Sequence, residues 1–347
     1  MPGVFEFENY AKIIAKKLFH GKTAEFRPLS GIHATLASIM SLTEPGDLMM
    51  SLPPAIGGHF ATRPIVEKSG RRWKPLPWDH HRFDLDLDRL AKEIKINRPH
   101  AIIFDHGMPL FPLSVSEVRK IIGDECRLIY DASHTLGLIG GGAFQNPIKE
   151  GCEILQGNTH KTFPGPQKAL IVTGDFETGR IIQDGLSQAI VSSQHTHHSL
   201  ALYCTLFEMQ AFSFSYARQI QANAQALAQA LSEEGFRVIS RGNEFTQSHM
   251  ILVDQWRKTS MEDACHLLHK AGFSLNARTY EEVPVLRIGV QEMTRRGMGE
   301  KEMRTIGCIF RWVLEGTMSP LLIQKYITDL NLNFSDVKYS FDDYKLL

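Results

Sequence analysis

The residue types best suited to catalysis in this chain surround one lysine. Lys161 lies between His160 and Thr162, just before a Pro/Gly-rich stretch at Pro164-Gly165-Pro166 that predicts a turn. A lysine amine in a loop can form a Schiff base with a carbonyl compound. An ordinary surface lysine is the alternative that this short stretch alone leaves open.

A second group of suitable residues lies about thirty positions earlier. The apolar, strand-like run Leu128–Tyr130 ends at Asp131, and His134 follows three places later. A carboxylate at the end of a strand can keep a pyridine nitrogen protonated, and a nearby lysine can hold the same cofactor as a Schiff base. Together these residues are what pyridoxal phosphate (PLP) requires, and PLP then acts as an electron sink.

Composition indicates a globular enzyme and excludes several other classes. The chain has 347 residues, 43% of them hydrophobic, and 38 basic residues balance 38 acidic ones. A net charge of zero gives no sign of a nucleic-acid or anionic-membrane partner. Five scattered cysteines form no CxxC pair, which argues against a disulfide framework or a thiolate zinc site. No run approaches a membrane span, and acids stand where a signal peptide needs cations, so we expect a cytoplasmic protein.

The pattern of elements in the first 200 residues predicts an α/β architecture. Helical spacing covers about 8–20 and 33–42, the second helix opening directly after Ser30-Gly31. Helix-like segments at Leu87–Ile94 and Val115–Ile122, with Ser114 as its cap, separate some of the strand-like runs. Those runs are Leu48–Leu52, Ala101–Phe104, Arg127–Tyr130, Glu153–Leu155 and Ala169–Val172. Strands alternating with helices predict a largely parallel sheet.

The alternation of strand-like and helix-like segments ends near residue 200. One or two long helices from Leu200 to Glu234 lead into a smaller α+β unit. Its predicted elements are strands at Arg237–Ser240, His249–Val253 and Pro284–Ile288 and helices at Met261–Ala271 and Glu300–Leu314. We therefore predict a PLP-binding α/β domain over 1–212, a C-terminal α+β domain over 213–330 and a tail over 331–347.

Seven motifs in one order resemble serine hydroxymethyltransferase, a family of fold type I, the aspartate-aminotransferase group. The resemblance runs from about Glu6 to about Glu315. Its motifs are Ser30-Gly31, Pro45-Gly46-Asp47, Gly57-Gly58-His59, Asp131 to Leu138, Thr159 to Thr162, Gly165-Pro166, and Arg287-Ile288-Gly289 followed by Thr294 to Gly297. One such motif is weak, whereas seven in the order of the family are strong evidence.

The resemblance gives roles to individual residues. It implies that Lys161 forms the Schiff base, that Asp131 pairs with the ring nitrogen and that His59 stacks on the ring. His134 is expected near the 3′-oxygen of the cofactor or beside Asp131. A general base is also needed, and His59, His134 and His160 all stay candidates. Arg287, at the end of a β-run, can bind an amino-acid carboxylate bidentately; a salt bridge at a sheet edge is its alternative.

The cofactor phosphate is expected at the helix that opens after Ser30. Backbone N–H groups and a hydroxyl at Ser30-Gly31, with Ile32 next to them, suit an anion, although Ser-Gly before a helix is by itself usually a cap. Asn158 and His160, on either side of Thr159, complete the cofactor contacts that the resemblance implies in this subunit. Ser193 and Gln194 stand where a neighbouring subunit of the family offers two glycines to the phosphate. The family also implies a homodimer with active sites at the interface.

Several positions depart from the family. Ile32 replaces a serine, Gly107 a cofactor-contacting serine, Asn158 a threonine and Gln167 an arginine. The segment from Asn276 to Arg287 is shorter than the folate-side loop of the family. The similarity also begins almost at Met1, so we expect the family's N-terminal Ser-Glu-Asn-Tyr and tyrosine-rich segment to be missing.

The expected function follows from the motifs that match the family and from the positions that depart from it. We expect a PLP-dependent enzyme that acts on glycine, serine or threonine by carbanion formation at Cα and aldol or retro-aldol chemistry, without folate. An aldehyde is the second expected partner. Aminotransfer, racemisation or elimination is one alternative, and a non-catalytic partner protein of the same fold is another. We expect no metal, because neither a carboxylate nor a cysteine accompanies the His195-x-His197-His198 cluster.

Overall fold

The computed structural model describes residues 2–193 and 195–346. They divide into two compact units, residues 1–214 and 215–347. The helix α8 (Thr196–Glu233) contains the division. Among the described residues no helix combines the length and the apolar surface that a bilayer span needs.

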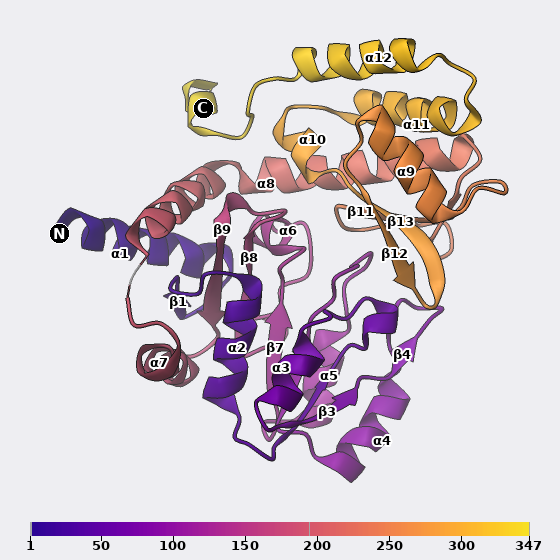
Figure 1. Ribbon diagram of the computed structural model, residues 1–347. Coiled ribbons are helices and arrows are strands. Elements are labelled where there is room, and N and C mark those ends of the chain that lie inside the picture. The colour runs from indigo at the N-terminus through magenta and orange to yellow at the C-terminus, as the bar shows by residue number, and fades with distance from the viewer. Residues whose placement is uncertain (1, 194, 347) are drawn as a thin grey trace. The chain divides into compact units, whose positions relative to one another are not determined.

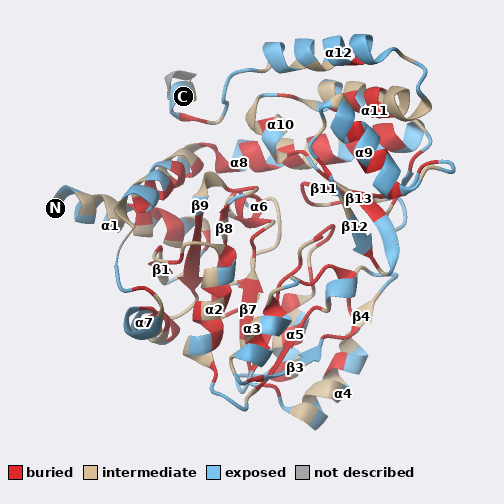
Figure 2. Cartoon of the chain, in the orientation of Figure 1, coloured by how far each residue is buried: buried red, intermediate tan, exposed pale blue. Residues whose placement is uncertain are grey.

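A seven-stranded sheet forms the centre of the first unit, in the order β1-β9-β8-β7-β6-β2-β3 (Figure 1). Its strands are β1 (Thr23–Glu25), β2 (Leu48–Ser51), β3 (Arg72–Pro75), β6 (Ala101–Phe104), β7 (Arg127–Asp131), β8 (Ile154–His160) and β9 (Pro164–Thr173). The five strands from β3 to β8 run parallel, and β9 and β1 are antiparallel to their neighbours. β2 and β6 are buried along their whole length, as expected of parallel strands covered on both faces. Figure 2 shows the colour of buried residues over most of β7 and β9 as well.

Helices cover the sheet of this unit. They are α1 (Pro2–Leu18), α2 (Gly31–Leu42), α3 (Thr62–Lys68), α4 (Leu87–Asn97), α5 (Val115–Ile122), α6 (Leu136–Gly140) and α7 (Phe176–Gly185), with a 3-10 turn at Pro54–Ile56 and a π-helix at Leu186–Ile190. A short hairpin joins β4 (Trp78–Asp79) to β5 (Asp84–Leu85). Ala34 and Ala37 of α2 pack with Ile103, Ile129 and Ile154 of the sheet in one buried cluster. Small residues on α2 therefore let its axis approach the strands that carry the site.

The second unit contains an antiparallel four-stranded sheet in the order β10-β11-β13-β12. Its strands are β10 (Arg237–Val238), β11 (Met250–Gln255), β12 (Asn276–Tyr280) and β13 (Val283–Gly289), and its helices are α9 (Met261–Ala271), α10 (Gln291–Arg295), α11 (Glu300–Glu315) and α12 (Pro320–Asn333). The C-terminal segment packs within this unit: the Lys338 amide donates to the Arg295 carbonyl at 2.7 Å, and the rings of Tyr216 and Tyr339 lie 5.2 Å apart.

The structure confirms the predicted fold class and most predicted elements, and it corrects three details. Pro164-Gly165-Pro166 is not a turn but the start of β9, because proline is tolerated at the first residues of a strand. The strand predicted at Glu153–Leu155 continues to His160. Ser114 precedes α5 without capping it through its side chain, since its hydroxyl contacts the Asp84 carboxylate instead. The assignment of a function to each unit stays a prediction.

Candidate active site

Two parallel strands bring the predicted catalytic residues to one edge of the sheet. Asp131 is the last residue of β7, and its partner on β8 is Gln156. β8 continues to His160, and Lys161 opens the connection at residues 161–163 that returns as β9. Ligands of open α/β sheets bind at the carboxyl ends of the strands, which is where Asp131 and Lys161 lie.

Lys161 is held in a defined position beside His134. Its Nζ lies 3.1 Å from His134 Nε2. The Thr162 hydroxyl donates to the His134 carbonyl at 2.8 Å and accepts from the Gly137 amide at 3.1 Å. A Cβ on Gly137 would lie 2.1 Å from the Thr162 carbonyl oxygen, so only glycine allows this approach. The lysine therefore lies on a turn that is fixed against the segment after Asp131.

The Asp131 carboxylate is held by neutral donors. Oδ1 accepts from the Ser133 amide at 2.8 Å, and Oδ2 accepts from the Thr35 hydroxyl at 3.2 Å. Thr35 belongs to α2, so the helix that packs on the sheet also orients this carboxylate. Neither of these two donors carries a charge. Its charge is available to a cation that enters the site.

His59 lies close to the Asp131 carboxylate and to the Lys161 amine. The pKa of this half-buried imidazole is lowered mainly by burial; the negative charge of Asp131 raises it in part, and the positive charge of Lys161 lowers it further. Its Nδ1 accepts from the Ala61 amide at 3.3 Å, which leaves the proton of the neutral ring on Nε2. His160 is exposed at the end of β8, and partial desolvation and then the charge of Lys161 lower its pKa.

The N-terminus of α2 meets the same edge. Ser30 caps this helix, its hydroxyl accepting from the His33 amide at 3.2 Å. The Gly31 amide donates to Asn158 Oδ1 at 2.7 Å, and the Asn158 amide donates to the Ser133 hydroxyl at 3.0 Å. The cap predicted as the alternative role of Ser30 is thus present, and Asn158 connects α2 to β8. Ile32, in the first turn, is exposed.

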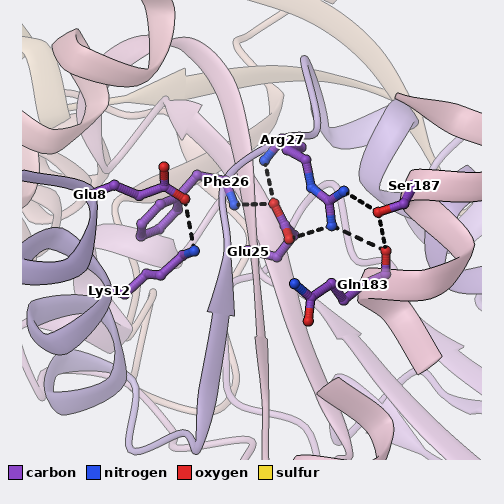
Figure 3. A network of polar contacts seen from close by, with 7 residues as sticks. All are labelled: Glu8, Lys12, Glu25, Phe26, Arg27, Gln183 and Ser187. Carbon is purple, nitrogen blue, oxygen red and sulfur yellow. Dashed lines mark hydrogen bonds and ion pairs between the residues drawn. The ribbon is translucent and has the colours of Figure 1, made fainter. Parts of the chain in front are cut away.

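A charged residue anchors the segment that leads into α2 (Figure 3). Arg27 pairs with Glu25 at 2.7 Å and donates to the Ser187 hydroxyl at 2.6 Å and to the Gln183 carbonyl at 3.2 Å. Glu25 in turn accepts from the Arg27 amide at 2.9 Å. The pair thereby fixes the strand before Ser30 to the helical segment that precedes Ser193.

The remaining predicted residues lie elsewhere in the chain. Ser193 is exposed in the segment before α8, and Gln194 lies outside the described residues. Arg287 belongs to the second unit, where it is half-buried on β13 opposite Leu252 and Asn276. Burial, and then the charge of Arg278, lower its pKa.

Comparison with known proteins identifies the family. The family model of serine hydroxymethyltransferase matches residues 3–310. A serine hydroxymethyltransferase of Korarchaeum cryptofilum is 36% identical over 97% of this chain and 83% of its own length. The chain belongs to the serine hydroxymethyltransferase family. It is accordingly a PLP-dependent enzyme of fold type I.

Two other relatives in this family have a different named activity. A fluorothreonine transaldolase of Streptantibioticus cattleyicolor is 38% identical over 96% of this chain, which spans 53% of that protein. The crystal structure of L-threonine transaldolase from Pseudomonas fluorescens superposes with a TM-score of 0.93 and is 29% identical, covering 99% of this chain and 80% of the other.

The residues present fit PLP. An amine, a carboxylate without a cationic partner among the described residues, and an imidazole converge at one sheet edge. The N-terminus of a twelve-residue helix lies beside them, and a helix N-terminus suits a phosphate. A cofactor with an aldehyde, a basic ring nitrogen and a phosphate matches this set of groups.

Several residues of the site were not predicted from the sequence. Thr35 and Ser133 orient Asp131, and Thr162 fixes the turn of Lys161. Asp105 follows strand β6 directly, as Asp131 ends β7. The signal that identified Asp131, a carboxylate at the end of an apolar run, was therefore also present at Asp105.

Proposed function

We propose that this enzyme breaks and re-forms the Cα–Cβ bond of a small β-hydroxy amino acid, serine or threonine, and passes the amino-acid part to an aldehyde without folate. The observation that carries the proposal is the Lys161–His134 contact beside Asp131 at the carboxyl edge of the sheet. The similarity to a fluorothreonine transaldolase and to an L-threonine transaldolase supports the choice of reaction within the family.

Lys161 would hold the cofactor through its side-chain amine, in the place that the amine of the substrate would take. When bound, PLP supplies an electron sink for the carbon atom whose bond breaks. A lysine must be neutral to attack a carbonyl carbon, and His134 Nε2, 3.1 Å away, is placed to exchange a proton with Nζ. Asp131 stabilises the protonated ring nitrogen, and His59 packs against the ring.

The proton of the substrate β-hydroxyl needs an acceptor during bond cleavage. Cleavage leaves an aldehyde, and the same proton returns to the oxygen of the new aldehyde when a bond forms in the reverse sense. His59, His134 and His160 are the candidates for this base. Burial and the charge of Lys161 lower the pKa of His59 and of His160, which favours the neutral form of both rings. His59 would have to give up the bond that its Nδ1 accepts from the Ala61 amide before that nitrogen could take a proton.

Two further sets of contacts belong to this proposal. Ser30, Gly31 and Ile32, with Asn158 and His160, line the cofactor site and its phosphate end. Arg287 binds the substrate carboxylate through a bidentate guanidinium pair.

We further propose that a second copy of the chain completes the site. Ser193 and Gln194 would then reach the phosphate of the partner. Phe5, Tyr10 and Ile13 expose more than half of their surface along α1, and such apolar surface is typical of a covered face. Sedimentation equilibrium measures the mass directly, and a monomer at micromolar concentration would contradict the dimer. The five cysteines, all free, agree with a reducing cytoplasmic location.

Product analysis tests the proposed reaction. The purified protein is incubated with PLP, with serine, threonine or alanine, and with or without an added aldehyde. Transaldolase activity gives acetaldehyde from threonine and a new β-hydroxy amino acid in equal amounts. A keto acid, an inverted α-carbon or ammonia would instead indicate aminotransfer, racemisation or elimination. No turnover of any amino acid would favour a non-catalytic partner protein.

A further inference from the structure

We propose that Asp105 is a positioning residue for His59, fixing the imidazole against the cofactor site through the backbone of residues 52–59. The inference rests on the proposed packing of His59 against PLP. It begins with the place of Asp105 in the sheet. β6 and β7 pair in register, Phe104 opposite Tyr130, so Asp105 and Asp131 follow side by side at the carboxyl edge.

The Asp105 carboxylate holds both ends of the segment 52–59. Oδ1 accepts from the Leu52 amide at 3.3 Å, and Oδ2 accepts from the His59 amide at 3.2 Å. The same His59 amide lies 3.1 Å from the Asp105 carbonyl oxygen. One side chain therefore closes the segment between the end of β2 and the predicted stacking residue.

Backbone packing shows that the two ends meet directly. A Cβ on Gly58 would lie 2.0 Å from the Leu52 carbonyl oxygen, so only glycine permits this approach. The two residues after Asp105 hold the same segment: the Gly107 amide donates to the Gly57 carbonyl at 2.6 Å, and His106 Nε2 lies 3.2 Å from the Ile56 carbonyl. Burial lowers the pKa of His106 to about 4, so this neutral ring donates through Nε2.

Asp105 lies in a costly environment for a carboxylate. Its side chain is buried beside Asp131; burial is the largest cause that raises its pKa to about 7, and the repulsion from Asp131 adds to it. Hydrogen bonds from the Thr62 hydroxyl and the His59 amide oppose that rise. A buried charge beside a like charge is destabilising unless donors satisfy it. Thr62 lies in α3, and the other two donors, the Leu52 and His59 amides, are the ends of the segment that carries His59. This indicates that the carboxylate is there to hold that segment.

The experiment is a double-mutant cycle on PLP affinity. Apo-protein is titrated with PLP, and the dissociation constant is measured for wild type, Asp105→Asn, His59→Ala and the double variant. Asparagine keeps the shape but offers one acceptor oxygen instead of two, so we expect roughly tenfold weaker binding. Because Asp105 acts through His59, the double variant should bind PLP no more weakly than His59→Ala alone.

Asp84→Asn serves as the matched control. Asp84 is also a buried carboxylate of the first unit that accepts from backbone amides, those of Leu85 and Ser114. Any loss of PLP affinity in Asp84→Asn is expected to add to the loss in His59→Ala, without coupling between the two. If Asp105→Asn does not fold, Asp105→Ser, which keeps one oxygen acceptor, enters the same cycle.

Any of three results would overturn the inference. Asp105→Asn could bind PLP as tightly as wild type, or the losses of PLP affinity in Asp105→Asn and His59→Ala could add in the double variant. Asp84→Asn could also couple to His59→Ala as strongly as Asp105→Asn does. Borohydride trapping of PLP on the wild-type protein separates this failure from that of the proposed function. If PLP attaches to Lys161 and the losses add, only the positioning role is wrong. If PLP attaches nowhere, the proposed function itself is wrong.

Discussion

Lys161 Nζ and His134 Nε2 lie 3.1 Å apart, on two segments that Thr162 ties together. An imidazole at this distance can take a proton from the ammonium and return it. Lysine must lose its proton before it attacks a carbonyl carbon, and His134 is placed to receive that proton. The contact between Lys161 and His134 depends on the short turn between β8 and β9.

Borohydride reduction of the PLP-loaded protein should fix the cofactor covalently to Lys161. Peptide mapping by mass spectrometry locates the modified residue. The matched control is Lys168→Met, which removes a nearby lysine on β9 and should leave the label on Lys161. A label at a different residue would contradict the role of Lys161.

Asp131→Asn should retain PLP but lose at least a hundredfold in turnover, because a neutral amide no longer stabilises the protonated ring. The fold should persist, since an amide oxygen can still accept from Ser133 or Thr35. Turnover and PLP content are measured on the same preparation. Turnover near that of wild type would show that Asp131 is only structural.

Arg287→Ala should weaken amino-acid binding roughly a hundredfold, because it removes a bidentate, charge-assisted pair. PLP binding should be unchanged, and Arg287→Lys should restore affinity only in part because an ammonium lacks the planar fork. Binding is followed by the absorbance change of the bound cofactor on addition of glycine. Arg278→Ala, on the paired strand β12, is the control. If only the control loses affinity, Arg278 binds the carboxylate.

Lys168 should make stability depend on pH. Its side chain is fully buried, and its Nζ has no hydrogen-bond partner among the described residues. Burial lowers its pKa to about 8, although Glu25 and Glu8 act in the opposite direction. Between about pH 8 and pH 10 the unfolded chain therefore binds more protons than the folded one, so the free energy of unfolding should rise with pH.

Urea unfolding at several pH values measures this dependence. Lys168→Met should remove it and raise stability at pH 7, since an apolar side chain replaces a buried, unpaired amine. Lys149→Met, at an exposed position, should change neither the pH dependence nor the stability at pH 7. Equal pH dependence in wild type and Lys168→Met would contradict the interpretation.

The sequence predicted those parts of the site that local patterns encode. Asp131 ends a strand-like run, and Lys161 lies in the loop after the next run, Glu153–Leu155. Parallel strands bring such ends to one edge, and the resemblance to the family singled out Lys161. The α2 helix was predicted because Ser30 is a good cap and apolar residues recur at helical spacing.

Contacts between distant segments could not be predicted in this way. The Thr35 bond to Asp131 joins residues 96 positions apart, and the Asn158 bond to Gly31 spans 127. Neither has a local pattern. Pro164-Gly165-Pro166 was read as a turn because its residues favour turns, but pairing with β8 made it a strand. Tertiary pairing decided the conformation there, against local preference.

Carbon–carbon bond exchange without folate can be tested in a single reaction. The PLP-loaded enzyme is given threonine and an aromatic aldehyde, with and without tetrahydrofolate, and both acetaldehyde and the new β-hydroxy amino acid are quantified. We expect equal amounts of the two products and the same rate in both reactions. A reaction that proceeds only with tetrahydrofolate, or acetaldehyde release without any new amino acid in the presence of acceptor, would contradict it.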